Sequence, residues 1–501
     1  MEESLQKLDA FFNPKTVAVI GATKKPGKAG CVIFENLATN KTTGVYKGEL
    51  YPVNPSEESL LGFKCFKTLS EVPVDQVDLV VIIVPSKAVA GVMEEAVAKK
   101  VKCAVIITAG FKEVGNKELE DQVVEIAKKG GIRILGPNCL GVFYRKSGVD
   151  TIFLPEMKTL SNGQKFVATP RPLSGNIAMI TQSGAFGSAA LDYLTGRGMG
   201  VSKFVSFGNK CDVSESDILN YLLQDDETTV VLVYLEDVKG GRAFIDIAKK
   251  VTLKKPVVVI KSGRSSAGAL AAASHTGAIA GSDKVYDAAF EQCGVIRARS
   301  MDEFFDYGKA LAMQPPATGK NMGVLTDAGG PGVMTVDELE TQGLTADRFD
   351  KETDEKFDQL KKESKILEIA ATHNPVDLTG SVIDDQFIVS ADIMFNDPKT
   401  HGIILLGLHH MPGLQETYIS GTVDVARKYN KPIVAVDIGE TDLAIYTRTH
   451  FDKMGVPSFD SPEAAARAMK ALVWYGEYLQ KNGGLEAYIA NFKKTVTASK
   501  P

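Results

Sequence analysis

Short apolar runs alternate with amphipathic segments of helix length along almost the whole chain. Two examples are TVAVIG at 16–21 and VDLVVIIV at 77–84, each followed by a longer segment in which apolar residues recur with helical spacing. Strands that helices cover on both faces read as continuous apolar runs, whereas strands with one wet face alternate. The pattern therefore predicts an α/β fold built on parallel sheets.

The apolar runs fall into three sets, which predict three domains. The expected strands are 16–21, 49–53, 77–84, 102–108 and 131–136 in the first set, 176–181, 203–207, 229–236, 255–261 and 294–298 in the second, and 321–326, 402–408 and 432–437 in the third. A chain of 501 residues is also too long for one hydrophobic core. We predict domains at 1–146, 147–314 and 315–482, and a C-terminal tail at 483–501. Residues 147–172 are rich in Gly, Pro, Ser and Thr and predict a linker or an irregular entry segment.

The composition narrows the class of protein. A formal net charge of -5 and a pI of about 5.9 do not suggest a surface for nucleic acid. No apolar run reaches the ~18 residues that a membrane span needs, and the acidic N-terminus lacks the basic and apolar parts of a signal peptide. The cysteines are scattered without a CxxC pair, which favours reduced thiols over a disulfide framework or a zinc site. These features together predict a cytoplasmic protein.

Five loops, three of them with glycine, follow the expected strands of the first set. They read GATKKPGKAG (21–30), VNP (53–55), VPS (84–86), TAGF (108–111) and GPNCLG (136–141). In open parallel sheets, ligands bind beyond the carboxyl ends of the strands, and free N–H groups at a helix start suit phosphate. Any one of these loops could be only a tight turn, but five of them at one sheet edge favour a nucleotide-containing ligand.

A dinucleotide cofactor such as NAD is disfavoured. The spacing of Gly21, Gly27 and Gly30 is not the GxGxxG of dinucleotide-binding loops. The second strand ends in Val-Asn-Pro, where an NAD-binding domain usually has Asp or Glu to hold the ribose. A nicotinamide-dependent oxidoreductase is therefore a weak hypothesis.

The second set contains a histidine with small neighbours. His275 lies in the segment GRSSAGALAAASHTGAIAGS at 263–282, whose small side chains leave space for a group to approach or to be attached. Glu236 ends the strand 229–236, where its carboxylate could orient one ring nitrogen and leave the other as the nucleophile. Taken singly, His275 could be a loop histidine without a function, and Glu236 a solvated strand end.

A turn that suits an anion falls at the same expected edge of the sheet. In TQSGAFG at 181–187, Gln182, Ser183 and Gly184 stand at the predicted start of a helix, with hydroxyl and backbone N–H donors. An imidazole, an anion cradle and a carboxylate together predict a site that accepts a phosphoryl group. The turn is not a nucleophile elbow, which disfavours a serine hydrolase. The other histidines have no spaced carboxylate or cysteine partners, so no metal site is expected.

Ten segments carry a resemblance to a known family. In chain order they are GATKKPGKAG, VNPSEESLLGFKCF, VIIVPS, ITAGF, GPNCLG, TQSGAFGSA, SFGNKCDVSESD, YLEDV, SHTGAIAGSD and TDAGGPGVM. With these segments the sequence resembles the α subunits of the ADP-forming acetyl-CoA synthetases, a branch of the succinyl-CoA ligase superfamily. The likeness extends over about residues 10 to 475, and GPNCLG combined with SHTGA is highly specific. It implies a Rossmann-like CoA-binding domain followed by two flavodoxin-like parallel-sheet domains.

The resemblance also implies roles for individual residues. His275 would be the phosphohistidine, Glu236 its orienting carboxylate, and the turn of Gln182, Ser183 and Gly184 the holder of phosphate. CoA would be bound by Gly21, Thr23, Gly27, Lys28, Val53, Asn54, Pro85, Ser86, Thr108, Gly110, Asn138 and Cys139. One departure from the family is Ser-Glu-Glu at 56–58, where many relatives carry a lysine.

The activity that the resemblance implies converts acyl-CoA, ADP and phosphate into a carboxylic acid, CoA and ATP, through an acyl phosphate and a phosphohistidine. Relatives act on acetate, propionate and branched, aryl and dicarboxylic acids, so the acid stays open. The sequence has no P-loop and no recognisable ATP-grasp domain. We therefore expect ADP or ATP, with Mg²⁺, to bind a separate ATP-grasp β subunit in an α2β2 assembly. The alternative is a non-catalytic CoA- or acyl-CoA-binding regulatory protein, which the presence of His275 and Glu236 disfavours.

Overall fold

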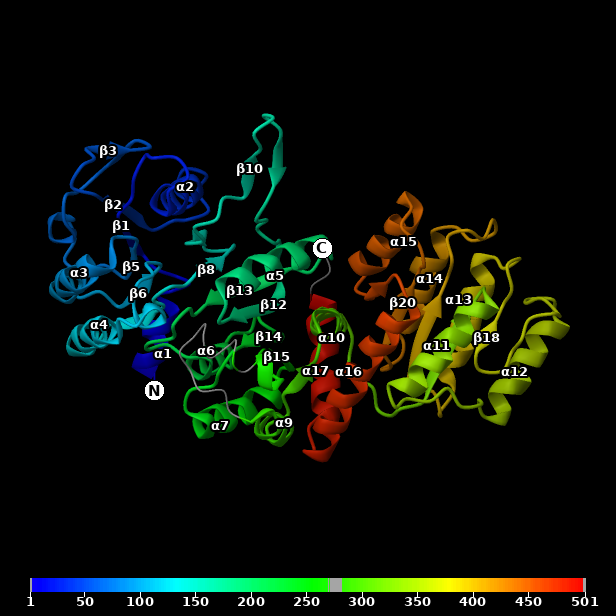
Figure 1. The fold of residues 1–501 in the computed structure, drawn as a ribbon. Coiled ribbons are helices and arrows are strands. Elements are labelled where there is room, and N and C mark those ends of the chain that lie inside the picture. The colour runs from blue at the N-terminus through cyan, green and yellow to red at the C-terminus, as the bar shows by residue number, and fades with distance from the viewer. Residues whose placement is uncertain (1, 269, 271–281, 499–501) are drawn as a thin grey trace. The chain divides into compact units, whose positions relative to one another are not determined.

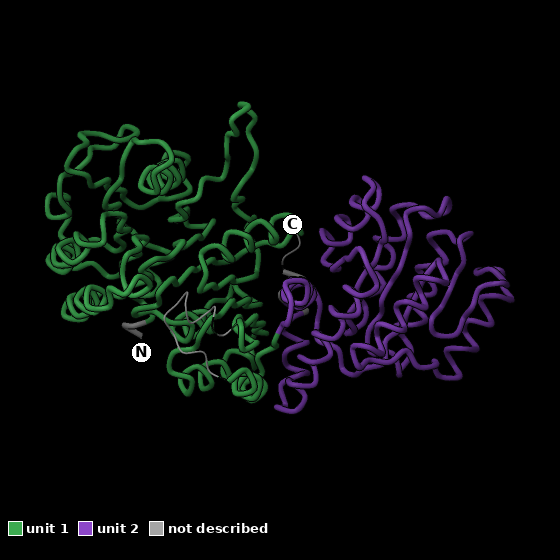
Figure 2. The backbone as a smooth tube through the Cα atoms, viewed as in Figure 1, with its two compact units in different colours: residues 1–297 green, residues 298–501 purple. Residues whose placement is uncertain are grey.

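The fold is given by a computed structural model that describes residues 2–268, 270 and 282–498. The chain divides into two compact units, residues 1–297 (unit 1) and residues 298–501 (unit 2) (Figure 2). Unit 1 contains two large sheets, and unit 2 contains one. The three domain boundaries drawn from the sequence stay predictions. Among the described residues, no helix combines the length and the apolar character that a bilayer span requires.

The first sheet of unit 1 is parallel, with its strands in the order β2-β1-β5-β6-β7 (Figure 1). The strands are β1 (Thr16–Ile20), β2 (Glu49–Val53), β5 (Leu79–Ile82), β6 (Cys103–Ile106) and β7 (Arg133–Leu135), and the helices are α1 (Glu2–Asp9), α2 (Ala29–Thr42), α3 (Ser86–Ala98) and α4 (Lys117–Gly130). Along β5, Leu79 and Val81 pack into one apolar cluster, whereas Val80 and Ile82 pack into another. Both faces of the strand are therefore buried, which explains its unbroken apolar run.

The second sheet of unit 1 has the order β16-β15-β14-β12-β13-β8-β9. Its strands are β8 (Gly141–Tyr144), β9 (Val149–Asp150), β12 (Ser174–Thr181), β13 (Val201–Ser206), β14 (Val230–Leu235), β15 (Val257–Lys261) and β16 (Ile296–Ala298), and its helices are α5 (Gly184–Gly196), α6 (Glu215–Leu222), α7 (Gly241–Thr252) and α9 (Asp283–Gln292). Strands β12 to β15 pair in parallel, but β8 is antiparallel to β13 and β9 is antiparallel to β8. The expectation of wholly parallel sheets is wrong at this edge.

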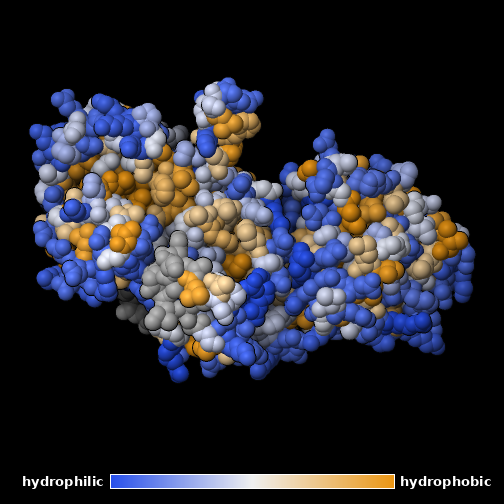
Figure 3. All heavy atoms as spheres, in the orientation of Figure 1, coloured by the Kyte–Doolittle hydropathy of each residue, from blue (hydrophilic) through white to orange (hydrophobic). Residues whose placement is uncertain are grey.

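Residues 147–172 are not the plain linker that their composition predicted. They contain β9 and a hairpin of β10 (Met157–Thr159) with β11 (Lys165–Val167). Met157, Phe166 and Val167 are 49%, 51% and 60% exposed, and apolar side chains are visible on this projecting hairpin in Figure 3. The prediction failed because strands this short leave no periodic pattern in a sequence.

Unit 2 is built on one parallel sheet with the order β18-β17-β19-β20-β21. The strands are β17 (Met322–Thr326), β18 (Val376–Asp377), β19 (Gly402–Leu406), β20 (Ile433–Val436) and β21 (Ser458–Phe459), and the helices are α10 (Met301–Met313), α11 (Gly329–Thr341), α12 (Lys351–Lys362), α13 (Asp384–Asn396), α14 (Thr417–Ala426), α15 (Asp442–Lys453), α16 (Pro462–Lys481) and α17 (Leu485–Ala498). The two-residue strands β18 and β21 were not predicted. Helix α17 lies where the sequence suggested a helix-like piece followed by a tail.

All three sheets share one topology. If the strands β1, β2, β5, β6 and β7 are numbered one to five, their order across the first sheet is 2-1-3-4-5. The same order describes β12 to β16 in the second sheet and β17 to β21 in unit 2. This is the doubly wound order of flavodoxin-like folds, in which the direction of winding reverses beside the first strand. The structure thus confirms the α/β class, and each sheet has the reversal point beside which folds of this order bind ligands.

Candidate active site

The loop at 136–141 joins the carboxyl ends of the two sheets of unit 1. It leaves β7 and enters β8, whose first residue, Gly141, pairs with Ser206 at the carboxyl end of β13. The backbone N–H of Leu140 donates to Ser206 Oγ at 3.1 Å. On the other side, the N–H of Asn138 donates at 3.0 Å to the carbonyl oxygen of Thr108, which lies two residues beyond the end of β6. The expected CoA loops and the expected phosphate turn therefore open onto neighbouring sheet edges.

The first CoA loop follows β1 at the point where the winding of the sheet reverses. Gly21 has φ +94°, and a Cβ on this residue would lie 2.3 Å from the carbonyl oxygen of Ile83. A Cβ on Gly30 would lie 2.1 Å from the carbonyl oxygen of Gly21. Lys28, the residue before α2, has no side-chain cap on that helix and is exposed. Only glycine allows the backbone to fold so closely here, and it leaves the start of α2 accessible.

The second loop is fixed to the first by hydrogen bonds. The carbonyl oxygen of Val53 accepts from the N–H of Gly21 at 2.9 Å, and Asn54 Nδ2 donates to the carbonyl oxygen of Ala22 at 2.7 Å. Glu57, from the segment that departs from the family, pairs with Lys24 at 3.1 Å and accepts from Thr23 Oγ1 at 3.4 Å. The hydrogen bond from Lys24 is the main reason that the pKa of Glu57 is lowered. Glu57 thus forms an ion pair with Lys24 of the first loop.

The loops after β5 and β6 also lie together. Thr108 Oγ1 donates to the carbonyl oxygen of Val84 at 2.7 Å, next to Pro85. Gly110 has φ +109°, and a Cβ there would lie 3.0 Å from Ser86 Oγ. The sheet edge therefore collects all the predicted CoA loops, as the sequence suggested, and the roles of these residues in binding CoA stay predictions.

Asn138 and Cys139 differ in accessibility although they are adjacent. Asn138 is exposed and has φ +58°, whereas Cys139 is only 3% exposed. The Cys139 thiol lies under the loop and contacts the carbonyl oxygen of Ile106 at 3.4 Å. Burial raises the pKa of this thiol to about 12, so it stays protonated near neutral pH. Of the two residues, Asn138 is the one placed to meet a ligand.

The expected phosphate turn connects β12 to α5. Ser183 is the N-cap of α5, and its Oγ accepts from the N–H of Phe186 at 3.2 Å. The first turn of the helix, which starts at Gly184, supplies backbone N–H groups and the positive end of the helix dipole. A Cβ on Gly184 would lie 3.7 Å from the Cβ of Leu140, in the loop that joins the sheets. The turn therefore lies beside the expected CoA site.

Gln182 has a different position from the one that its predicted role suggests. Its side chain is 8% exposed and points along the sheet edge rather than to solvent. Oε1 accepts from the N–H groups of Glu236 and Asp237 at 3.0 and 3.2 Å, and Nε2 donates to Asp237 Oδ1 at 2.5 Å. Gln182 thus ties the phosphate turn to the end of β14 and to the residue that carries the predicted catalytic carboxylate.

Glu236 directly follows β14, at the edge that the sequence predicted. Burial raises the pKa of its neighbour Tyr234, and the negative charge of Glu236 adds to the effect. His275 lies outside the described residues. The chain that leads toward it leaves β15, the strand beside β14, and the N–H of Ser262 donates to the carbonyl oxygen of Leu235 at 2.9 Å. The segment with the histidine therefore starts one strand away from Glu236.

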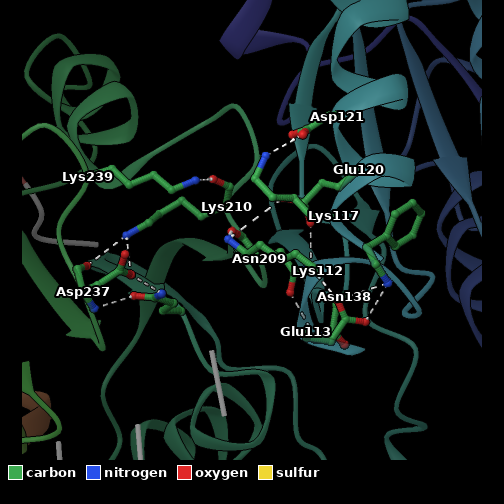
Figure 4. Close-up of polar contacts among 12 residues, drawn as sticks. Lys112, Glu113, Lys117, Glu120, Asp121, Asn138, Asn209, Lys210, Asp237 and Lys239 are labelled. Atoms are coloured by element: carbon green, nitrogen blue, oxygen red, sulfur yellow. Dashed lines mark hydrogen bonds and ion pairs between the residues drawn. The ribbon is translucent and has the colours of Figure 1, made fainter. Parts of the chain in front are cut away.

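A buried polar network links the two sheet edges, and the sequence analysis did not identify it (Figure 4). Its centre is Lys210, whose ammonium pairs with Glu215 at 3.0 Å and with Asp237 at 3.1 Å. The preceding residue, Asn209, donates through Nδ2 to Glu113 in the first sheet domain. Both residues belong to SFGNKCDVSESD, a segment that entered the analysis only as part of the family pattern. A lysine among acidic and amide neighbours was the available signal.

Three family models match successive parts of the chain. They are described as a CoA binding domain at residues 15–145, a succinyl-CoA ligase-like flavodoxin domain at 174–311 and a Ligase-CoA domain at 322–469. The chain is 39% identical over 493 residues to acetate–CoA ligase (ADP-forming) I subunit alpha of Pyrococcus furiosus, covering 95% of this chain and 99% of that protein. This chain belongs to the ADP-forming acetate–CoA ligase α-subunit family.

Two further comparisons extend the likeness to a solved structure and to a longer relative. The solved structure of dinucleotide forming acetyl-coenzyme A synthetase 1 of Ca. Korarchaeum cryptofilum, in complex with phosphate and ADP, is 36% identical with a TM-score of 0.84, covering 95% of this chain and 98% of that chain. The acetate–CoA ligase (ADP-forming) of Methanocaldococcus jannaschii is 35% identical over 96% of this chain. The match covers only 65% of that longer protein. Family members thus include proteins of this length and longer ones.

Proposed function

We propose that this chain is the CoA-binding, phosphohistidine-carrying subunit of an ADP-forming acyl-CoA synthetase. The observation that carries the proposal is the meeting of two sheet edges at the loop 136–141. One edge has the glycine-rich loops expected for CoA, and the other has a capped helix start beside Glu236. A thioester and a phosphate held at these two edges would be close enough to react. The reaction converts acyl-CoA, phosphate and ADP into a carboxylic acid, CoA and ATP.

The chemistry divides into three transfers. A phosphate oxygen attacks the thioester carbonyl, the C–S bond breaks and CoA leaves as its thiol, which yields an acyl phosphate. A ring nitrogen of His275 then attacks phosphorus, and the carboxylate of the free acid is the leaving group. Finally, an oxygen of ADP attacks the phosphohistidine, which forms ATP and restores the imidazole. Each step moves a charged group between positioned donors, so orientation and electrostatic stabilisation supply the catalysis.

The described residues have separate tasks in this scheme. The start of α5 at Gly184 and the Ser183 hydroxyl hold the phosphate, because N–H groups and the helix dipole favour an anion there. Glu236 orients the imidazole of His275 so that the other ring nitrogen is the nucleophile. Gln182 does not need to touch phosphate, since its amide already holds the turn against the end of β14.

The nucleotide belongs, in this proposal, to a second chain. The P. furiosus protein of matching length is called a subunit alpha, whereas the longer M. jannaschii relative extends beyond the region that matches. An ATP-grasp β subunit would supply the site for ADP and Mg²⁺, in an α2β2 assembly located in the cytoplasm.

The proposal predicts phosphate on His275. When the chain is mixed with an ATP-grasp partner, Mg²⁺ and ATP labelled at the γ-phosphate, it should acquire a label that is stable in alkali and labile in acid. His275→Ala should abolish both the label and turnover but leave CoA binding, measured by calorimetry, within about 3-fold of wild type. The matched control is His373→Ala in unit 2, which should label normally. Labelling that persists in His275→Ala would show that the nucleophile is another residue.

A further inference from the structure

Lys210 is a charged residue with no solvent-exposed side-chain surface. Its Nζ lies 3.0 Å from Glu215 Oε2 and 3.1 Å from Asp237 Oδ1, and it donates to the carbonyl oxygen of Asp237 at 2.9 Å. The backbone of Lys210 has φ +57°, which is uncommon for a residue other than glycine. A buried ammonium in a left-handed conformation is held by its tertiary contacts, and breaking one of its ion pairs would leave an uncompensated buried charge.

The contacts of Lys210 lead directly to the phosphoryl-transfer edge. Burial alone would raise the pKa of Asp237, but the charge of Lys210 and the hydrogen bond from Gln182 lower it, so this carboxylate is ionised. Asp237 accepts from Gln182 Nε2, and Gln182 Oε1 accepts the N–H of Glu236 at 3.0 Å. The residue after Gln182 is Ser183, the cap of α5. One carboxylate and one amide thus connect the Lys210 ammonium to both parts of the predicted site.

The neighbouring residue, Asn209, leads in the opposite direction. Its Nδ2 donates to Glu113 Oε2 at 2.5 Å and to Glu120 Oε2 at 2.9 Å (Figure 4). Glu113 in turn accepts the N–H of Gly110 at 2.5 Å, in the loop that follows β6. Asn209 Oδ1 accepts from Asn138 Nδ2 at 3.4 Å. Two of the expected CoA loops are therefore fastened to the Asn209 side chain.

We infer that Asn209 and Lys210 are positioning residues that couple CoA binding to the phosphoryl-transfer site, an inference that rests on the function proposed above. The two residues share a peptide bond, so a shift of the CoA loops that moves Asn209 also moves the ammonium that holds Asp237. Binding of CoA then changes how rigidly the end of β14 is held. It also changes the affinity of the α5 turn for phosphate. Such coupling is reciprocal and typically amounts to about 5- to 150-fold in affinity.

A purely structural role would be to hold the two sheets of unit 1 together, and another residue provides a control for it. Arg133 in β7 pairs with Asp212 and with Asp217, each at 3.0 Å. These contacts also join the first sheet to the second, but they run to Asp212 and to Asp217 in α6 and not to Asp237 at the end of β14. Arg133→Met removes both cross-sheet ion pairs and leaves Lys210, Glu215 and Asp237 in place, so it reports the effect of weaker packing between the sheets.

The first test uses hydrogen exchange in the full chain with and without CoA. In the wild type, CoA should slow exchange of the Glu236 and Asp237 amides by about 5-fold or more. In Lys210→Met this protection should disappear while the Kd for CoA stays within about 3-fold. Arg133→Met should keep the protection. Protection that persists in a folded Lys210→Met chain, or that is lost equally in Arg133→Met, would overturn the inference.

Lys210→Met removes the ion-pair partner of the buried Glu215 carboxylate and of the partly buried Asp237 carboxylate and could fail to fold, so Asp237→Asn is the second variant. It keeps the shape of the side chain and the Lys210–Glu215 pair, and it should lose most of the protection by CoA. A folded Asp237→Asn chain with wild-type protection would equally overturn the inference.

A second readout separates the inference from the function on which it rests. With the ATP-grasp partner present, Lys210→Met or Asp237→Asn should slow phosphate incorporation at His275 by about 10- to 100-fold. If the wild-type chain acquires no phosphate, the proposed function is wrong, and the exchange experiment still decides the coupling. If the wild type is labelled and neither folded variant is slowed, the positioning role is wrong and the proposed function stands.

Discussion

Lys210 and Asp327 are both buried ionisable residues, but they differ in their partners. Lys210 has two carboxylates within ion-pair distance. Asp327, at the carboxyl end of β17, accepts one hydrogen bond, from the N–H of Leu408 at 2.8 Å, and its Oδ1 has no hydrogen-bond partner among the described residues. Burial raises the pKa of Asp327 to about 7, and the nearby carboxylates of Asp437 and Asp377 contribute to the rise.

This environment predicts that unit 2 loses stability as the pH rises. The folded chain keeps a proton on Asp327 up to about pH 7, whereas the unfolded chain releases it near pH 4, so the folded state binds more protons in between. Its contribution is complete below about pH 4 and is lost as the pH passes 7. The loss should be on the order of 2–4 kcal/mol, seen as a falling free energy of unfolding between pH 5 and 8 in denaturant titrations.

Two substitutions check the origin of this slope. Asp327→Asn has the same shape without the titrating proton, so most of the dependence on pH should disappear. Asp358→Asn, on the exposed face of α12, is the matched control and should retain the wild-type slope. If Asp327→Asn keeps the full slope, another group, such as the buried Asp437, is responsible.

At the scale of elements, the site depends on loops that only glycine can form. The loop between β1 and α2 turns at Gly21, which is left-handed and lies against the backbone of Ile83 in β5's loop. Gly44, at the other end of α2, has a similar φ of +80°, but nothing lies within 4 Å of its Cβ position. A side chain at either position would be strained by the positive φ, but only a side chain at Gly21 would also clash with neighbouring atoms.

This difference predicts unequal effects of alanine at the two ends of α2. Gly21→Ala should weaken CoA binding by about 10- to 100-fold, because a methyl group 2.3 Å from a carbonyl oxygen forces β1's loop away from β5. Gly44→Ala should lower the melting temperature by a few degrees through strain of about 1 kcal/mol, with CoA affinity within about 3-fold of wild type. Calorimetric titration with CoA measures the affinity of each variant, and a thermal melt measures the stability of Gly44→Ala. Equal losses of affinity in the two variants would mean that the clash at Gly21 does not determine CoA binding.

At the scale of the whole molecule, the two sheets of unit 1 share one apolar core. One buried cluster runs through both sheets of unit 1, from Val17 in β1 and Val105 in β6 to Val205 in β13 and Val233 in β14. Strand β8, inside the range predicted for the first domain, also pairs with the second sheet. Unit 2 has a separate cluster around Leu325 and Leu405. Folding of the two sheets in unit 1 is therefore expected to be interdependent.

The arrangement of the cores predicts how fragments behave. A fragment of residues 299–501 should fold alone, with a cooperative thermal transition and native-like circular dichroism, because its core is complete. A fragment of residues 1–146 should be unstable or aggregate, because it would expose the half of the shared cluster that the second sheet covers. A stable, cooperatively folding 1–146 fragment would contradict the shared core.

The sequence alone determined the fold class, the positions of the longer strands and the sheet edges at which the candidate site residues gather. Apolar runs such as 77–84 gave the strands because burial of both faces requires an unbroken apolar pattern, and the structure places β5 within this run. Parallel strands end at a common edge, so the loops at 21–30 and 108–111 could be grouped before any coordinates were considered. The proximity of the turn at Ser183 to Glu236 followed from the same rule and is confirmed by the bonds of Gln182.

Only the tertiary structure decided features that depend on partners distant in the sequence. The antiparallel pairing of β8 with β13, the burial of Cys139 and the bonds of Gln182 are set by segments about 30 to 60 positions away in the chain, and no local pattern encodes such pairings. The same holds for Lys210, because its acidic and amide neighbours in the sequence do not show that it is buried. Its charge is tolerated inside the protein because Glu215 and Asp237 approach it from two other elements, and that convergence exists only in the folded chain.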